Sequence, residues 1–167
     1  MKRDIAQLLF LIDTAYDHVS WHGPNLRGAL RGVTPGVAAW RPQPGRHNIW
    51  ELLVHAAYWK YVAWRRLTGA KRGSFSLEGS NWFQRPQAPR VDRSLGRRWV
   101  SDLRADLDLL DTTHRTLRDA VARLDAAALD RHLGKSAVTP RVLVTGVAAH
   151  DLYHAGQIQL LKRLGGR

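Results

Sequence analysis

Apolar residues recur at steps of three and four through four long stretches of the chain, which is the spacing of an amphipathic α-helix. These stretches cover residues 4–30, 48–70, 94–124 and 139–164. None of them shows the alternation expected of a half-buried β-strand. Four long helices within 167 residues can bury one sizeable core. The pattern therefore predicts an all-α fold, with one domain over residues 1–167 built as a four-helix bundle with long crossover connections.

Residues that favour helix starts mark two of these stretches. Asn48 and Glu51 stand three residues apart at the beginning of the second stretch, as in a capping box. Thr139 and Pro140 supply an N-cap and a first helical residue for the fourth stretch. We therefore expect these two helices to begin at these positions.

The remaining segments contain helix breakers. Gly23-Pro24 can kink or break the first helix, because proline has no N–H to donate. Residues 32–48 are rich in proline and glycine, and we expect Trp40 within them to pack over the end of the bundle. Residues 70–93 form a long polar connection, which is either a functional lid or a crossover that only spans the bundle. The fourth helix is expected to end before Gly165-Gly166.

The formal net charge is +12, and arginine supplies most of it. Such a charge fits either a polyanionic partner or a solvated basic surface. The basic residues are scattered, and no recognition helix or RNA-binding motif gathers them. We therefore interpret the charge as a solvated surface and expect no nucleic-acid partner.

Composition also bounds the setting and the chemistry. The chain has no cysteine, which excludes disulfides, thiolate metal ligands and a cysteine nucleophile. No run approaches the roughly 18 apolar residues that a membrane-spanning helix needs. The N-terminal residues lack the pattern of a secretory signal. These features predict a cytoplasmic protein with no membrane contact.

Three histidines lie within the apolar faces of the second and fourth predicted helices. His150 and His154 are four residues apart, so both rings lie on one helical face. His55 has the same apolar setting in ELLVHAAYW. Each histidine alone could be a hydrogen-bonded core residue, but two neighbouring buried imidazoles need partners, and a transition metal satisfies both. If the two helices meet face to face, His55, His150 and His154 can surround one divalent metal ion, with positions left for water or substrate.

Residues near these histidines are candidates for supporting roles. Gln157 lies close to the face of His154 and can orient a ring or bind substrate. Tyr58 and Trp59 flank His55 and can line a pocket. Asp151 points roughly 100° away from His150 on the helix, so it can hydrogen-bond a neighbouring histidine but is not expected to bind the metal.

Other polar residues in the helical stretches are weaker candidates. His18 and His22 form a second pair four residues apart, but the surrounding pattern is mixed and Pro24 lies close by. The third stretch carries acidic residues and a histidine that we interpret as parts of an outer or boundary face: Asp106, Asp108, Asp111 and His114.

The segments GVTPGVAAWRPQPGRHNIWELLVHAAYW (residues 32–59) and VAAHDLYHAGQIQLLKRL (residues 147–164) resemble the DinB-like superfamily. The resemblance implies a four-helix bundle with a long crossover, commonly dimeric. It implies a divalent metal, zinc or nickel among others, on the three histidines that match His55, His150 and His154. Members with known activity include enzymes that use low-molecular-weight thiols, such as mycothiol-dependent maleylpyruvate isomerase and bacillithiol S-transferases.

Two hypotheses of function follow. The first is a metal-dependent enzyme acting on a small molecule, a thiol S-transferase or a hydrolase, whose catalytic residues beyond the metal ligands are unassigned. The absence of cysteine fits a thiol supplied by another molecule. The alternative is a non-catalytic, metal-binding or stress-related dimeric module with a basic surface. The sequence leaves both open and names neither the metal nor the thiol.

Overall fold

The computed structural model describes residues 2–88 and 96–165. Within these residues the regular elements are helices: α1 (Lys2–Tyr16), α2 (Leu26–Ala29), α3 (Pro35–Ala39), α4 (Ile49–Thr68), α5 (Arg97–Ala122) and α6 (Pro140–Gly165), with the 3-10 turn η1 (Ala126–Ala128). The predicted all-α class is confirmed. No helix in the described part of the chain is both long and apolar enough to cross a membrane.

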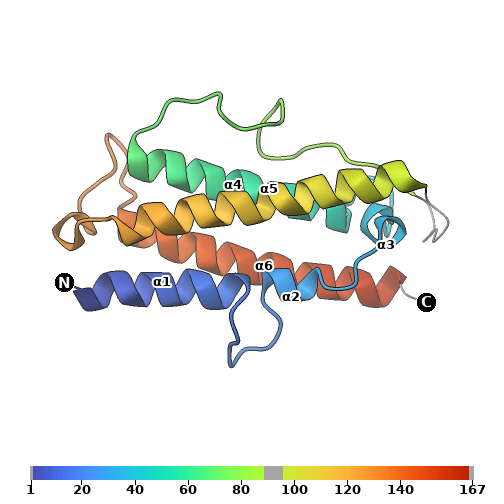
Figure 1. The fold of residues 1–167 in the computed structure, drawn as a ribbon, viewed down its shortest axis with the longest axis horizontal. Coiled ribbons are helices and arrows are strands. Elements are labelled where there is room, and N and C mark those ends of the chain that lie inside the picture. Colours follow the sequence, from blue (N-terminus) through green and yellow to red (C-terminus); the bar gives the residue numbers. More distant parts are fainter. Residues whose placement is uncertain (1, 89–95, 166–167) are drawn as a thin grey trace.

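The four long helices form a bundle around a shared core. Both α1 and α4 pack against α5 and α6. Figure 1 shows that α4 and α5 run in the same direction, opposite to α1 and α6. Two neighbouring helices that run in parallel need a connection as long as the helices themselves, and the segment between α4 and α5 crosses back along the bundle in this way (Figure 1).

The predicted helix starts are confirmed. Asn48 caps α4: its side chain accepts from the Glu51 N–H at 2.9 Å, and the Glu51 carboxylate accepts from the Asn48 N–H at 3.4 Å. The Thr139 hydroxyl accepts from the Val142 N–H at 3.3 Å at the start of α6. These bonds satisfy amide donors that a helix start otherwise leaves without partners.

Trp40 packs over the end of the bundle, as predicted. A Cβ atom on Gly165, the last described residue of α6, would lie 2.6 Å from the Trp40 ring. The Trp40 backbone forms an isolated bridge with Ala88, which ties the connection after α4 to the segment before it. The helix includes Gly165 instead of ending before it. A side chain at this position would collide with the Trp40 ring.

The first predicted helix, over residues 4–30, is wrong in its second half. α1 ends at Tyr16, and Val19, an apolar residue within the predicted range, is 99% exposed. Gly23 adopts φ of 96°, which no α-helix contains. Asn25 then caps the short helix α2 by accepting from the Gly28 N–H at 2.8 Å. The helix therefore ends at Tyr16, ahead of the Gly23-Pro24 pair, and is interrupted instead of kinked at that pair.

The third predicted helix corresponds to α5. Its predicted first residues, Ser94 and Leu95, lie outside the described residues, as do residues 89–93 of the preceding connection. Of the three carboxylates predicted at the surface of this helix, only Asp108 is exposed. Asp111 is half-buried and ion-paired with Arg27 at 2.9 Å.

Two polar residues of α5 that were predicted at an outer or boundary face are buried. Asp106 accepts from Trp50 Nε1 at 2.6 Å and from Arg85 Nε at 2.7 Å. His114 is 4% exposed, and its ring stacks on that of Tyr16. The prediction failed because both residues share the inner face of α5 with its buried leucines, where burial is tolerated once a polar group has partners.

Candidate metal centre

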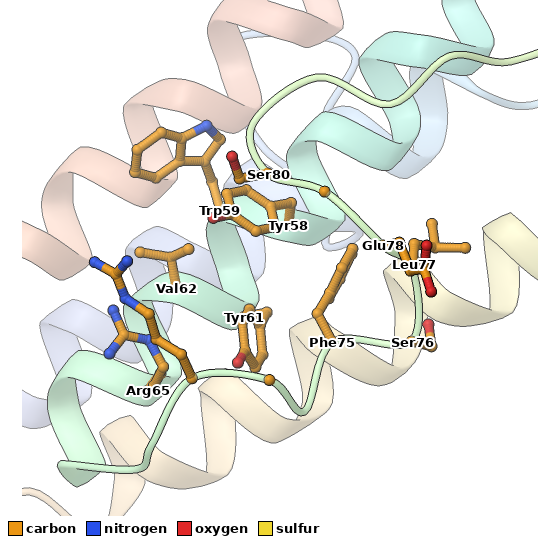
Figure 2. A pocket seen from close by; sticks show the side chains of 13 residues that line it. Tyr58, Trp59, Tyr61, Val62, Arg65, Phe75, Ser76, Leu77, Glu78 and Ser80 are labelled. Atoms are coloured by element: carbon orange, nitrogen blue, oxygen red, sulfur yellow. The ribbon is translucent and has the colours of Figure 1, made fainter.

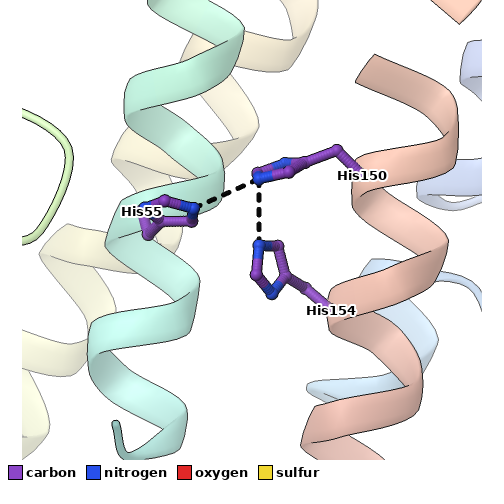
Figure 3. A group of neighbouring side chains, drawn as sticks. All are labelled: His55, His150 and His154. Carbon is purple, nitrogen blue, oxygen red and sulfur yellow. Dashed lines mark hydrogen bonds between the residues drawn. The ribbon is translucent and has the colours of Figure 1, made fainter. Parts of the chain in front are cut away.

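The three predicted histidines meet between α4 and α6. Figure 3 shows His55 projecting from α4 toward His150 and His154, which project from neighbouring turns of α6. His150 Nε2 lies 3.1 Å from His55 Nε2 and 3.0 Å from His154 Nε2. One ligand atom from each residue falls within 4.8 Å of the others. The three rings can hold a metal ion through their Nε2 atoms.

Acceptors on the far side of two rings fix their tautomers. His55 Nδ1 lies 2.7 Å from the Asn81 carbonyl oxygen, and His154 Nδ1 lies 2.6 Å from Gln157 Oε1. A carbonyl oxygen only accepts, so each Nδ1 carries the proton and donates it. The Nε2 atoms of His55 and His154 therefore present lone pairs to the space in front of His150, which is the arrangement that metal-binding histidines use.

Burial keeps the three imidazoles neutral. His55 is 6% and His154 3% exposed. Burial lowers the pKa of His55, and the Asn81 carbonyl opposes this shift. Burial, then repulsion from His154 and His55, lowers the pKa of His150 to about 3. Burial lowers the pKa of His154 to about 4, against the hydrogen bond to Gln157. At neutral pH all three rings are in the unprotonated form that binds transition metals.

Aromatic rings from α4 and from the segments on either side of it surround His55. The Trp82 ring stacks on that of His55, with ring centroids 3.8 Å apart. The His47 ring also stacks on Trp82, with centroids 3.5 Å apart. Trp59 meets both His55 and His150 edge-on, each at 6.3 Å. Indole rings therefore border the cluster on the His55 side. Of the three histidines, His150 is the least buried.

Asn81 ties this wall to the cluster. Besides accepting from His55 through its carbonyl, it accepts from Trp59 Nε1 through its side chain at 3.0 Å. It is the one non-glycine residue with positive φ, 64°, in the described ranges 2–88 and 96–165. Asparagine adopts this conformation more readily than most residues. Sequence reasoning missed Asn81 and Trp82 as site residues, because helical periodicity carries no information about a loop.

The predicted supporting residues divide into two groups. Gln157 and Trp59 contact the histidine cluster, as described above. Tyr58 faces away from it, toward Phe75 and Phe83, with ring centroids 5.3 and 5.4 Å away. Asp151 forms an ion pair with Lys60 instead of bonding a histidine.

The ion pair between Lys60 and Asp151 lies in the core between the two helices that carry the histidines. Both side chains are 1% exposed. The ammonium also lies 4.8 Å from the centre of the Tyr16 ring, a cation–π contact. Burial raises the pKa of Asp151, and attraction by Lys60 opposes the shift. The pair couples α4 to α6 one residue from His150. It was not predicted, because helical periodicity does not show which residue of another helix lies opposite Lys60.

His114 belongs to the same buried polar region. Its ring is 3.7 Å from that of Tyr16 with an angle of 12° between the planes. Burial, reinforced by the positive charges of Lys60 and Arg118, lowers the pKa of His114 to about 2. Its Nδ1 has no hydrogen-bond partner in the part of the chain that the structure describes. His22, the weaker ligand candidate, is exposed and lies outside the metal cluster, as does His18.

Comparison with known proteins identifies one family. The model of the DinB superfamily matches residues 18–158, which include all three histidines of the cluster. No curated protein and no solved structure matches the chain.

Replacing Lys60 with methionine leaves Asp151 buried without a counter-charge, so the variant should lose about 3–5 kcal/mol of unfolding free energy. The double variant Lys60→Met/Asp151→Leu removes both charges and should recover most of that loss. Urea unfolding of the two variants and the wild type measures the difference. A single variant that is as stable as the double would show that the pair is not held as ions.

His114 should make the fold sensitive to acid. Its folded-state pKa of about 2 lies below its ordinary value of 6.5, so below about pH 6.5 the unfolded chain takes up a proton that the folded chain does not. The free energy of unfolding should therefore decrease as the pH is lowered, and this residue should contribute up to about 1.4 kcal/mol per pH unit to that decrease. His114→Phe keeps a ring against Tyr16 without the titration. Its unfolding free energy, followed from pH 7 to 5, should fall less steeply than that of the wild type; equal slopes would contradict the assignment.

Proposed function

We propose a metal-dependent enzymatic function for this chain, which belongs to the DinB superfamily. The proposed resident metal is a divalent transition ion, zinc or nickel, held by His55, His150 and His154. The proposed reaction is transfer of a low-molecular-weight thiol to a small electrophilic substrate, with hydrolysis as a second possibility.

The convergence of three neutral Nε2 atoms carries this proposal. In two of the rings, His55 and His154, the Nδ1–H on the far side donates to Asn81 or Gln157, and this hydrogen bond leaves the lone pair on Nε2. Nitrogens this close need a hydrogen or a cation between them, and a set of three imidazole donors around one point fits a divalent ion. Such an ion supplies Lewis acidity, which lowers the pKa of a coordinated thiol or water.

The remaining residues of the site orient ligands and restrict access. Asn81 and Gln157 keep the His55 and His154 rings in place. Trp82 covers His55 and Trp59 borders His150, so water is partly excluded from the cluster. The net charge of +12 favours the approach of anionic substrates and thiols.

The composition of the cluster favours thiol transfer over hydrolysis. In the described part of the chain, the group of possible ligands contains histidines and no carboxylate. Asp151, the nearest acidic residue in sequence to His150, is paired with Lys60. Metalloproteases of the His-Glu-x-x-His type use a glutamate as general base, whereas a metal-acidified thiol is itself the nucleophile. The same lack of a base is compatible with the alternative, a non-catalytic metal-binding module.

Metal content separates the cluster from other histidines. Protein purified without a histidine tag should contain close to one equivalent of divalent metal by mass spectrometry. The variant His150→Ala/His154→Ala should lose it. The matched control His18→Ala/His22→Ala changes an exposed pair with the same spacing and should keep it. Absence of metal from the wild type after reconstitution with zinc and nickel would contradict the proposal.

A thiol titration separates the two functions. Cobalt-substituted protein should change its visible absorption when a low-molecular-weight thiol is added, because only the enzymatic proposal requires the thiol to reach the metal. A spectrum that does not respond to any thiol tested would favour the non-catalytic module.

We further propose that the chain forms a homodimer through the outer face of α6. Val142, Tyr153 and Leu160 are 59%, 63% and 58% exposed on this helix. With the exposed small residues between them they follow alternating steps of four and three, as in a coiled coil: residues 142, 146, 149, 153, 156 and 160. Glycine or alanine at three of these positions lets a second helix approach closely. The inner face of α6 is already used by the core, so this second stripe is available to another copy.

Light scattering after size exclusion tests this interface. The wild type should have the mass of a dimer, and Val142→Glu/Leu160→Glu should have the mass of a monomer with unchanged helix content, since charges cannot be buried without partners. Val100→Glu introduces a charge at a 53% exposed position on α5 and should remain dimeric. A monomeric wild type would contradict the proposal.

A further inference from the structure

A pocket that the metal cluster does not explain lies between α4 and the connection that follows it. Its volume is about 710 Å³, and its lining comes from residues 58–65 of α4 and residues 72–80 of the connection. Figure 2 shows the rings of Tyr58, Tyr61 and Phe75 arranged around this space, with Trp59 at one end. The volume lies within the range of pockets for small molecules, roughly 300–1,000 Å³.

The aromatic wall of the pocket is already assembled. The Phe75 ring lies 5.3 Å from those of both Tyr58 and Tyr61, and 5.4 Å from that of the buried Phe83. The Ser74 hydroxyl donates to the Tyr61 hydroxyl at 3.3 Å. These contacts fix the connection onto α4, so binding a flat apolar ligand would require little reorganisation.

Charge is distributed unequally around the pocket. Arg65 and Arg72 line it, and Figure 2 places Arg65 on the opposite side from Glu78, the acidic lining residue. Within residues 2–88 and 96–165, the arginine ion pairs are formed by residues other than Arg65 and Arg72: Arg27, Arg41, Arg85, Arg98, Arg118, Arg131 and Arg141. A guanidinium binds a carboxylate through two parallel hydrogen bonds. The two arginines therefore offer unused donors for an acidic group beside an aromatic wall.

The pocket adjoins the metal cluster through Trp59. This ring lines the pocket and also meets His55 and His150 edge-on. Ser80, another lining residue, directly precedes Asn81, whose carbonyl accepts from His55. A ligand in the pocket thus lies one indole ring away from the candidate metal centre.

We propose that this pocket binds a small aromatic acid, with the flat body of the ligand against Tyr61 and Phe75 and its carboxylate on Arg65 and Arg72. This inference names a substrate class for the proposed metal centre. Its relevance to catalysis rests on the proposed function. Binding itself needs only the pocket residues, so it is expected in metal-free protein as well.

Calorimetric titration with two matched probes tests the proposal. One probe is 1-naphthylacetate, and the other is 2-(1-naphthyl)ethanol, which has the same ring system with an alcohol in place of the carboxylate. The acid should bind the full-length wild type at least about tenfold more tightly than the alcohol, since a hydrogen bond to a charged group contributes on the order of 1.5–3 kcal/mol. Metal-free and metal-loaded protein should both show this preference.

Arginine variants locate the acidic group. Arg65→Gln/Arg72→Gln should bind the acid at least about tenfold more weakly and leave binding of the alcohol unchanged. The control Arg104→Gln/Arg123→Gln removes two exposed charges from α5 and its end, away from the pocket, and should bind both probes as the wild type does. An equal loss in this control would overturn the assignment by showing that only the overall charge matters.

The remaining outcomes separate this inference from the proposed function. Equal affinity for the two probes, or binding of neither, overturns the inference even if the protein holds its metal. Selective binding of the acid by a protein that takes up no metal supports the pocket while the proposed function fails.

Discussion

Three buried imidazoles that meet nitrogen to nitrogen need their rings held in place, with a hydrogen or a metal ion between the facing nitrogens. In this structure the Nε2 atoms of His55, His150 and His154 approach within 3.0–3.1 Å along two of the three pairs. Burial keeps the rings neutral, so each close pair needs a hydrogen on one nitrogen or a cation between the two. The surrounding contacts hold the rings in this arrangement: Asn81 and Gln157 accept from two rings on their far sides, and the buried Lys60–Asp151 pair joins the helices that carry them.

Other parts of the fold serve the same region. The parallel direction of α4 and α5 requires a long crossover, and this crossover supplies Asn81 and Trp82 to the cluster and Phe75 to the neighbouring pocket. The two faces of α6 differ: the inner face carries two histidines of the cluster, and the outer face carries exposed apolar residues. The described part of the connection between α4 and α5 therefore both spans the bundle and contributes residues to the candidate site.

Helical periodicity predicted the parts of the molecule that depend on local spacing. It located four long helices and put His150 and His154 on one face, and the capping residues located the starts of α4 and α6. The meeting of His55 with this pair depends on which helices are neighbours, and the resemblance to a known superfamily supplied that expectation. Lys60, Asp106 and His114 could not be assigned from the sequence, because each is buried only by virtue of a partner far away in the chain. Asn81 was beyond reach because its role depends on a left-handed loop conformation.

X-ray absorption spectroscopy on the metal-loaded protein tests the claim that the three histidines form one metal centre. The account predicts scattering from three imidazole rings, with oxygen from water at the remaining positions, and two rings after His55→Ala. A spectrum with one imidazole or none, or one that His55→Ala leaves unchanged, would contradict it. The histidines would then be neutral core residues held by Asn81 and Gln157, with no shared ion.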